Sequence, residues 1–328
     1  LVCENLEIED ARRKNYALYH VNAAQESVEK FNSNSALFEY IKALKIHPLN
    51  LEVRLSYANW LLNEGYPEAF LSQLKFIETQ GVVSQTVSDK IESYDSLLEN
   101  TIANRWDLDP FYLDKSRISI GLYYKNDNVT LLHPDSSKVC ASLIADSFSA
   151  FPYFNVSAYQ NSVKSYSQAF NNARKSNYDS FGIVNFDENE RENSISIDLY
   201  VTATGSLAKK WNVYRTGNKK LFAAVEKLVL DMVSSFETRG KILQRKSNQV
   251  LIDLGKRDGI TLDSYFVVAK KDEVKIADSG IGLILSEDME LGFVELIEVG
   301  EDISVGTFVQ KGFYDKMNPS DEIFLVAK

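Results

Sequence analysis

Residues 35–48 place small and aromatic side chains at fixed helical intervals. Ala36, Tyr40 and Ala43 follow one another at steps of four and three residues, and Pro48 comes shortly after them. Such steps bring side chains to one face of an α-helix, where small residues let a second helix approach closely. Because proline cannot continue a helix, the segment predicts one member of a closely packed helix pair that ends before Pro48.

A second helix pair with related spacing is expected from Leu51 onward, with its return helix over residues 68–79. The two segments together resemble the tetratricopeptide repeat over about residues 12–80, although Phe70 stands where that repeat has a small residue. The resemblance implies a short helical array with a groove that binds another protein. Its packing signature consists of Ala36, Tyr40, Ala43, Pro48, Tyr57, Ala58 and Gly65.

The predicted groove is small. In the register of the second repeat, four side chains are expected to project into the concave face, namely Glu52, Leu55, Asn59 and Leu62. An interface below about 1,000 Å² is weak or transient unless a further surface contributes. An apolar pattern over residues 83–104 predicts one more helix that caps the array.

Residues 107–238 alternate between strand and helix patterns. Strands are expected over 117–124, 154–159, 178–186, 194–203 and 209–215, and helices over 136–150, 163–176 and 218–236. This order predicts an α/β sandwich with a mixed sheet.

From residue 239 onward the sequence is almost wholly strand-like and is broken by turns. Five or more short strands, one of them over residues 281–285, favour a small closed barrel, because closure removes exposed strand edges. The predicted fold class is therefore α+β multidomain. It comprises a tetratricopeptide-like helical array (1–106), an α/β domain (107–238) and a small carboxy-terminal β-barrel (239–328).

Two further resemblances rest on motifs in the second and third domains. Residues 165–174, the strand at 182–186 and the Thr-Gly turn at 203–207 resemble the amino-terminal domain shared by the periplasmic Tol-system propeller protein, the curli secretion lipoprotein and the flagellar assembly protein T. Residues 250–268 and 318–326 resemble the carboxy-terminal barrel of the flagellar assembly protein T. Both resemblances imply an envelope assembly factor of a bacterium with two membranes.

The charge balance argues against nucleic acid as a partner. Acidic side chains outnumber basic ones by 46 to 36, which gives a net charge of −10. Such a chain repels phosphate backbones and anionic lipid surfaces. No run of 18 apolar residues occurs, so we expect no helix that spans a bilayer.

The sequence predicts no metal, no cofactor and no catalytic centre. His20, His47 and His133 lie far apart and have no neighbours at ligand spacing. The acidic run at 187–192 lacks the spacing that wraps calcium, and it predicts a solvated hairpin tip. Neither a Gly-x-Ser-x-Gly motif nor a phosphate-binding loop is present.

The two cysteines predict different roles. Cys140 lies in the apolar helical pattern of residues 137–144, which predicts a buried thiol. Cys3 follows Leu1 and Val2, so one interpretation is the lipidated first residue of a bacterial lipoprotein. The alternative is that the sequence starts at an arbitrary point. Membrane contact is expected only through a lipid at Cys3.

These observations predict a non-enzymatic periplasmic scaffold or assembly protein, with protein partners in an envelope machine such as the flagellar motor periphery. An alternative is a module that binds a small ligand or peptidoglycan in a cleft between the α/β domain and the barrel. An enzyme is a third hypothesis, and it requires a cluster of perturbed carboxylates in a cleft.

Overall fold

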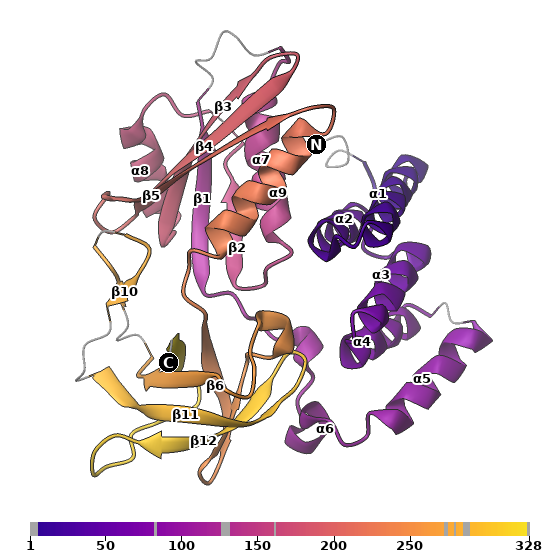
Figure 1. The fold of residues 1–328 in the computed structure, drawn as a ribbon, viewed down its shortest axis with the longest axis vertical. Coiled ribbons are helices and arrows are strands. Elements are labelled where there is room, and N and C mark those ends of the chain that lie inside the picture. Colours follow the sequence, from indigo (N-terminus) through magenta and orange to yellow (C-terminus); the bar gives the residue numbers. More distant parts are fainter. Residues whose placement is uncertain are drawn as a thin grey trace. The chain divides into compact units, whose positions relative to one another are not determined.

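A computed structural model describes residues 6–81, 84–125, 132–160, 162–271, 275–278, 280–284 and 289–326 (Figure 1). It has the predicted α+β multidomain class, with a helical array, a mixed sheet and a closed barrel. The contacts divide the chain into two compact units. Unit 1 comprises residues 1–114, 238–271 and 290–328, and unit 2 comprises residues 115–237 and 272–289.

The helical array of unit 1 begins with two helix pairs. They are formed by α1 (Ala11–Glu29) with α2 (Ser33–Ile46), and by α3 (Leu51–Asn63) with α4 (Pro67–Thr79). The side chains of Asp10, Asn32 and Asn50 cap the first three helices by accepting backbone N–H bonds. The shared core of the array is rich in alanine and aromatic residues, among them Ala17, Ala24, Ala36, Tyr40, Ala43, Tyr57 and Trp60.

The single helix expected over residues 83–104 is wrong, because two helices stand there. These are α5 (Gln85–Leu97) and the short α6 (Ile102–Trp106), followed by a 3₁₀ turn at Pro110–Tyr112. The Asn104 side-chain amide donates to the carbonyl oxygens of Leu98 and Glu99, and Thr101 caps α6. These bonds use the free backbone groups at the break and so stabilise two separate helices.

The barrel of unit 1 is closed and contains six strands in the order β11-β12-β7-β6-β13-β8. Its strands are β6 (Arg239–Lys246), β7 (Gln249–Ile252), β8 (Tyr265–Ala269), β11 (Glu290–Val299), β12 (Ser304–Gln310) and β13 (Glu322–Val326). All neighbouring strands are antiparallel, and a 3₁₀ turn at Lys256–Asp258 follows β7. Their inward side chains are fully buried, including Ile242, Val250, Phe266, Val268, Val294 and Ile323.

The strand expected over residues 281–285 does not continue the barrel. The short strands β9 (Lys275–Ile276) and β10 (Leu283–Ile284) pair only with each other among the described residues, and their segment belongs to unit 2. The Thr204 hydroxyl donates to the Asp278 carbonyl oxygen at 2.8 Å. This bond attaches the hairpin to the β4–β5 turn, so the segment is an insertion from the barrel sequence into the other unit.

Unit 2 is built on a mixed sheet of five strands in the order β2-β1-β3-β4-β5. Its strands are β1 (Ile118–Tyr124), β2 (Phe154–Ala158), β3 (Ser180–Glu188), β4 (Glu192–Val201) and β5 (Leu207–Thr216). The first three are mutually parallel, and the last two are added antiparallel. The predicted order of strands and helices is therefore confirmed, with shifts of a few residues at the ends.

Helices cover both faces of this sheet, but not equally. The helices α7 (Ser136–Phe148) and α9 (Lys220–Val233) pack side by side on one face (Figure 1). The short helix α8 (Tyr166–Lys175) packs on the other face over β3, where Ala169 and Ala173 contact Phe181 and Ile183. The β1–β2 end of the α8 face is therefore less covered. No helix in the described parts of the chain is both long and apolar enough to cross a membrane.

Candidate functional site

The packing signature of the array lies where α2, α3 and α4 meet. Ala36, Tyr40 and Ala43 of α2 are buried, and the Tyr40 ring lies 5.6 Å from those of both Tyr57 and Trp60. The signature residue Ala58 is fully buried as well, among side chains of α4 and α5. Two signature residues shape the turns. Pro48 accepts a 2.7 Å hydrogen bond from Arg54, and Gly65 has a φ of +88° after α3.

The four groove candidates lie on α3 but divide into two pairs. Glu52 and Asn59 are exposed, whereas Leu55 and Leu62 are half-buried against the cluster of Phe70, Leu74 and Ile91. Ser56 lies between the exposed pair and accepts a long hydrogen bond of 3.5 Å from Gln25 of α1. The polar pair therefore lies on a face shared with α1, while the leucines pack toward α4 and α5. Binding of a partner at these residues stays a prediction.

The junction between α4 and the barrel is a feature that the sequence did not indicate. Tyr66 precedes α4 and provides no side-chain cap. The carboxylate of Glu301, in the β11–β12 turn, takes this role by accepting the backbone N–H bonds of Glu68 at 2.7 Å and Ala69 at 2.8 Å. Glu301 is only 5% exposed. A residue of the barrel thus caps a helix of the array.

Close backbone packing holds Glu301 in place. A Cβ atom on Gly255 would lie 2.4 Å from the Glu301 carbonyl oxygen, so only glycine fits there. The Arg257 N–H donates to the same oxygen at 3.0 Å, and the Arg257 side chain pairs with Asp302 at 3.1 Å. The turn that carries the capping carboxylate is therefore fixed by the 3₁₀ turn after β7.

Acidic groups gather at this junction. Burial, followed by the negative charges of Glu301 and Asp302, raises the pKa of the Glu68 carboxyl to about 7. Burial also raises the pKa of Glu301, although the two N–H bonds from α4 oppose that change. The junction therefore holds a carboxyl group that changes its protonation near neutral pH.

A second contact joins α6 to the barrel. Ile102 and Trp106 share a buried cluster with Leu251, Ile303 and Val305. The Lys246 ammonium group lies 4.3 Å from the centroid of the Trp106 ring, and it donates to the backbone carbonyl of Arg105 at 3.0 Å. The array and the barrel thus share buried residues within one compact unit.

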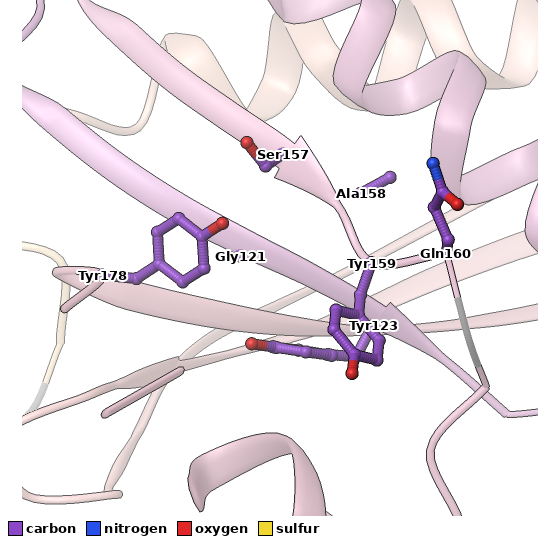
Figure 2. A pocket seen from close by; sticks show the side chains of 7 residues that line it. All are labelled: Gly121, Tyr123, Ser157, Ala158, Tyr159, Gln160 and Tyr178. Atoms are coloured by element: carbon purple, nitrogen blue, oxygen red, sulfur yellow. The ribbon is translucent and has the colours of Figure 1, made fainter. Parts of the chain in front are cut away.

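Unit 2 contains a pocket on the α8 face of its sheet, over β1 and the edge strand β2 (Figure 2). Its volume is about 310 Å³. We call it the tyrosine pocket, and its lining consists of Gly121, Tyr123, Ser157, Ala158, Tyr159, Gln160 and Tyr178. None of these residues was expected from the sequence to form a site.

Strand alternation and one glycine build the tyrosine pocket. Gly121 and Tyr123 lie on the same face of β1, and Ser157 of β2 is the neighbour of Gly121 in the ladder. A Cβ atom on Gly121 would lie 2.6 Å from the Tyr178 ring, so this ring needs glycine beneath it. Tyr178 follows α8, where Asn177 has a φ of +54° and the Tyr178 N–H bonds to the Ala173 carbonyl.

The remaining predicted residues take simple structural roles. Cys140 is a fully buried free thiol, as predicted, and burial raises its pKa. Cys3 lies outside the described residues. His20 pairs with Glu39 at 2.6 Å and His133 with Glu188 at 3.2 Å, and no cluster of potential metal ligands occurs in the described residues. The acidic run at 187–192 forms the end of the β3–β4 hairpin, as predicted.

Comparison with known proteins gives one domain match and several slight structural likenesses. A family model for the second domain of the TPASS_0648 family matches residues 117–234, less than half of the chain. A PelC dodecamer structure from Paraburkholderia phytofirmans is 16% identical, with coverage of 37% of this chain and 90% of that one, at a TM-score of 0.29. The LpoB carboxy-terminal domain from Salmonella enterica is 11% identical, with coverage of 31% and 84%, at a TM-score of 0.25.

No curated protein matches the chain. The matched domain lies within unit 2 and contains the whole tyrosine pocket. At these TM-scores the structural likenesses assign no function.

Proposed function

We propose that this chain is a non-enzymatic scaffold protein that docks other proteins in a bacterial envelope machine, such as the periphery of the flagellar motor. The observation that carries the proposal is the junction in unit 1. There Glu301 caps α4, and α6 shares a buried core with the barrel. Helices held in this way present their outer surface in a fixed orientation, which lowers the entropy lost when a partner binds.

The docking surface in this proposal is the face of α1 and α3 that contains Gln25, Glu52 and Asn59. All three side chains are exposed, and their amide and carboxylate groups can bond to the backbone of a partner. A face of this size buries less than a stable interface requires, so we expect a transient complex or a second contact surface.

The proposed compartment is the periplasm. Its support is the resemblance of residues 165–174 and 250–268 to domains of envelope assembly proteins. A lipid on Cys3 is part of the same proposal and would attach the scaffold to a membrane surface. That modification stays a prediction.

Site-specific crosslinking tests the docking proposal. A photoreactive phenylalanine replaces Asn59 of the full chain in the native cell, and crosslinked proteins are identified by mass spectrometry. We expect an envelope protein to be captured at Asn59, and we expect Gln25→Arg to reduce its yield severalfold by placing a bulky charge on the same face.

The control carries the same photoreactive group at Lys316, which is exposed on the loop after β12. It should capture little of the same protein. Equal capture from both positions, or capture of no envelope protein at Asn59, would contradict the proposal.

A further inference from the structure

The tyrosine pocket has no role in the docking proposal, and the chemistry of its lining limits what can enter it. None of its seven lining residues is a lysine, arginine, aspartate or glutamate. A charged ligand would lose water on entry and meet no opposite charge, which is costly. The lining therefore favours a neutral ligand.

The lining also contains many hydrogen-bonding groups for its size. It has three phenol hydroxyls, the hydroxyl of Ser157 and the amide of Gln160, so both donors and acceptors are present. A purely apolar ligand would cover these groups without bonding to them. The lining therefore favours a ligand with several polar groups.

Tyr123 gives the most specific indication of a ligand. This residue is 1% exposed and lines the pocket, yet its hydroxyl makes no hydrogen bond to any residue in the described ranges. Among the described residues the Tyr123 oxygen is not one of the fully enclosed polar atoms without a partner, so the hydroxyl faces the pocket and can bond to a molecule bound there. Burial, followed by the nearby Tyr178 and Tyr159, raises the pKa of Tyr123 to about 12. The group therefore keeps its proton and acts as a donor at neutral pH.

Aromatic rings supply the other half of the lining. The rings of Tyr123 and Tyr159 lie 5.4 Å apart, and Tyr178 lies across Gly121 from them (Figure 2). The face of such a ring carries partial negative charge and attracts C–H groups. A sugar ring combines a face of C–H groups with a rim of hydroxyls, which matches both halves of the lining.

We propose that the tyrosine pocket binds one neutral sugar ring of a saccharide. In this pose the C–H face packs against a tyrosine ring, and the ring hydroxyls bond to Tyr123, Ser157 and Gln160. The volume of about 310 Å³ lies at the lower end of the range for small-ligand pockets, about 300–1,000 Å³. Because β2 is an edge strand, and both Ser157 and the residue just after the strand, Tyr159, are exposed, a longer saccharide can continue past the sheet.

The test uses the full chain and a panel of defined probes. Saturation-transfer NMR and calorimetry measure the binding of maltotriose, cellotriose and N-acetylglucosamine trisaccharide as neutral sugars. Trigalacturonic acid serves as the charged comparison and p-cresol as the apolar one. We expect at least one neutral trisaccharide to bind one-to-one with a Kd of about 1 mM or lower, and neither comparison to compete with it.

Two variants assign the binding to the pocket. Ser157→Arg places a large side chain over the pocket from an exposed position, so it should abolish binding while leaving the unfolding temperature unchanged. Tyr123→Phe removes one donor and keeps the ring, so it should weaken binding by about tenfold. Tyr112→Phe alters an exposed tyrosine of unit 1 and should change nothing.

Three results would overturn the inference. They are no binding of any neutral trisaccharide at about 10 mM, unchanged binding by Ser157→Arg, and binding of p-cresol in place of the sugars. The crosslinking experiment at Asn59 uses no saccharide. A negative result in the saccharide-binding test therefore leaves the docking proposal untouched, and a negative crosslinking result leaves the pocket proposal untouched.

Discussion

Glu68 occupies the second position of α4, where its side chain is half-buried beside the carboxylate of Glu301. Burial and the neighbouring negative charges raise its pKa from an ordinary 4.5 to about 7. Because the folded chain holds this proton more tightly than the unfolded chain does, the group lowers the free energy of unfolding as pH rises from about 4.5 to 7. Above pH 7 the full penalty is present, and below 4.5 it is absent.

Glu68→Gln removes this ionisable group and keeps the shape of the side chain. We expect the variant to be more stable than the wild type by about 1–2 kcal/mol at pH 8, after allowance for partial solvent screening, and equal to it near pH 4. Urea unfolding at the two pH values measures the difference. The neighbouring acidic groups Glu298, Glu301 and Asp302 and the basic Lys256 remain, so part of the pH dependence should persist.

Glu92→Gln is the matched control, because Glu92 is exposed on α5. Its free energy of unfolding should follow the wild type at both pH values. A stability gain for Glu68→Gln that is equal at pH 4 and pH 8 would show that packing, and not protonation, causes it.

At the level of elements, the start of α4 depends on a residue 233 positions away in the sequence. Glu301→Ala leaves two N–H groups of the first turn without their partner, and these groups are shielded from water. We expect a loss of about 2–3 kcal/mol in the free energy of unfolding and faster hydrogen exchange at Glu68 and Ala69. NMR exchange rates report on these two amides directly.

Glu295→Ala provides the comparison for this prediction, since Glu295 is exposed on β11. It should change stability by less than about 0.5 kcal/mol and leave exchange in α4 unaltered. Unchanged exchange at Glu68 in the Glu301→Ala variant would contradict the capping role.

Local sequence signals predicted most elements because each helix of the array and each strand of the sheet has its own periodicity. The break between α5 and α6 could also have been predicted, since Thr101 and Asn104 are typical capping residues. The cap of α4 could not be predicted from the sequence, because no local pattern connects Tyr66 to Glu301. Contacts between distant segments leave no periodic trace in a single sequence.

The same limit applies to the candidate site at the scale of the whole molecule. Tyr123, Tyr159 and Tyr178 come from three different segments and meet only because β1 and β2 pair in parallel and α8 returns beside them. Gly121 within a strand pattern was the one local signal of a close approach. The sequence likewise predicted the array and the barrel, but not that they belong to one compact unit.

The array and the barrel share a buried core, so a substitution in that core should destabilise both parts of unit 1. Trp106 contacts Leu251, Ile303 and Val305 of the barrel, so Trp106→Ala should cost about 3–5 kcal/mol. Hydrogen exchange with mass spectrometry in increasing urea should show α3, α4, β7 and β12 losing protection together, at a lower urea concentration than in the wild type.

Phe181→Ala, at a fully buried site in β3, is the reciprocal control and should instead expose the strands of unit 2. If Trp106→Ala lowers the protection of the barrel strands while the array helices keep theirs, the two parts unfold independently and the rigid junction that supports docking is lost.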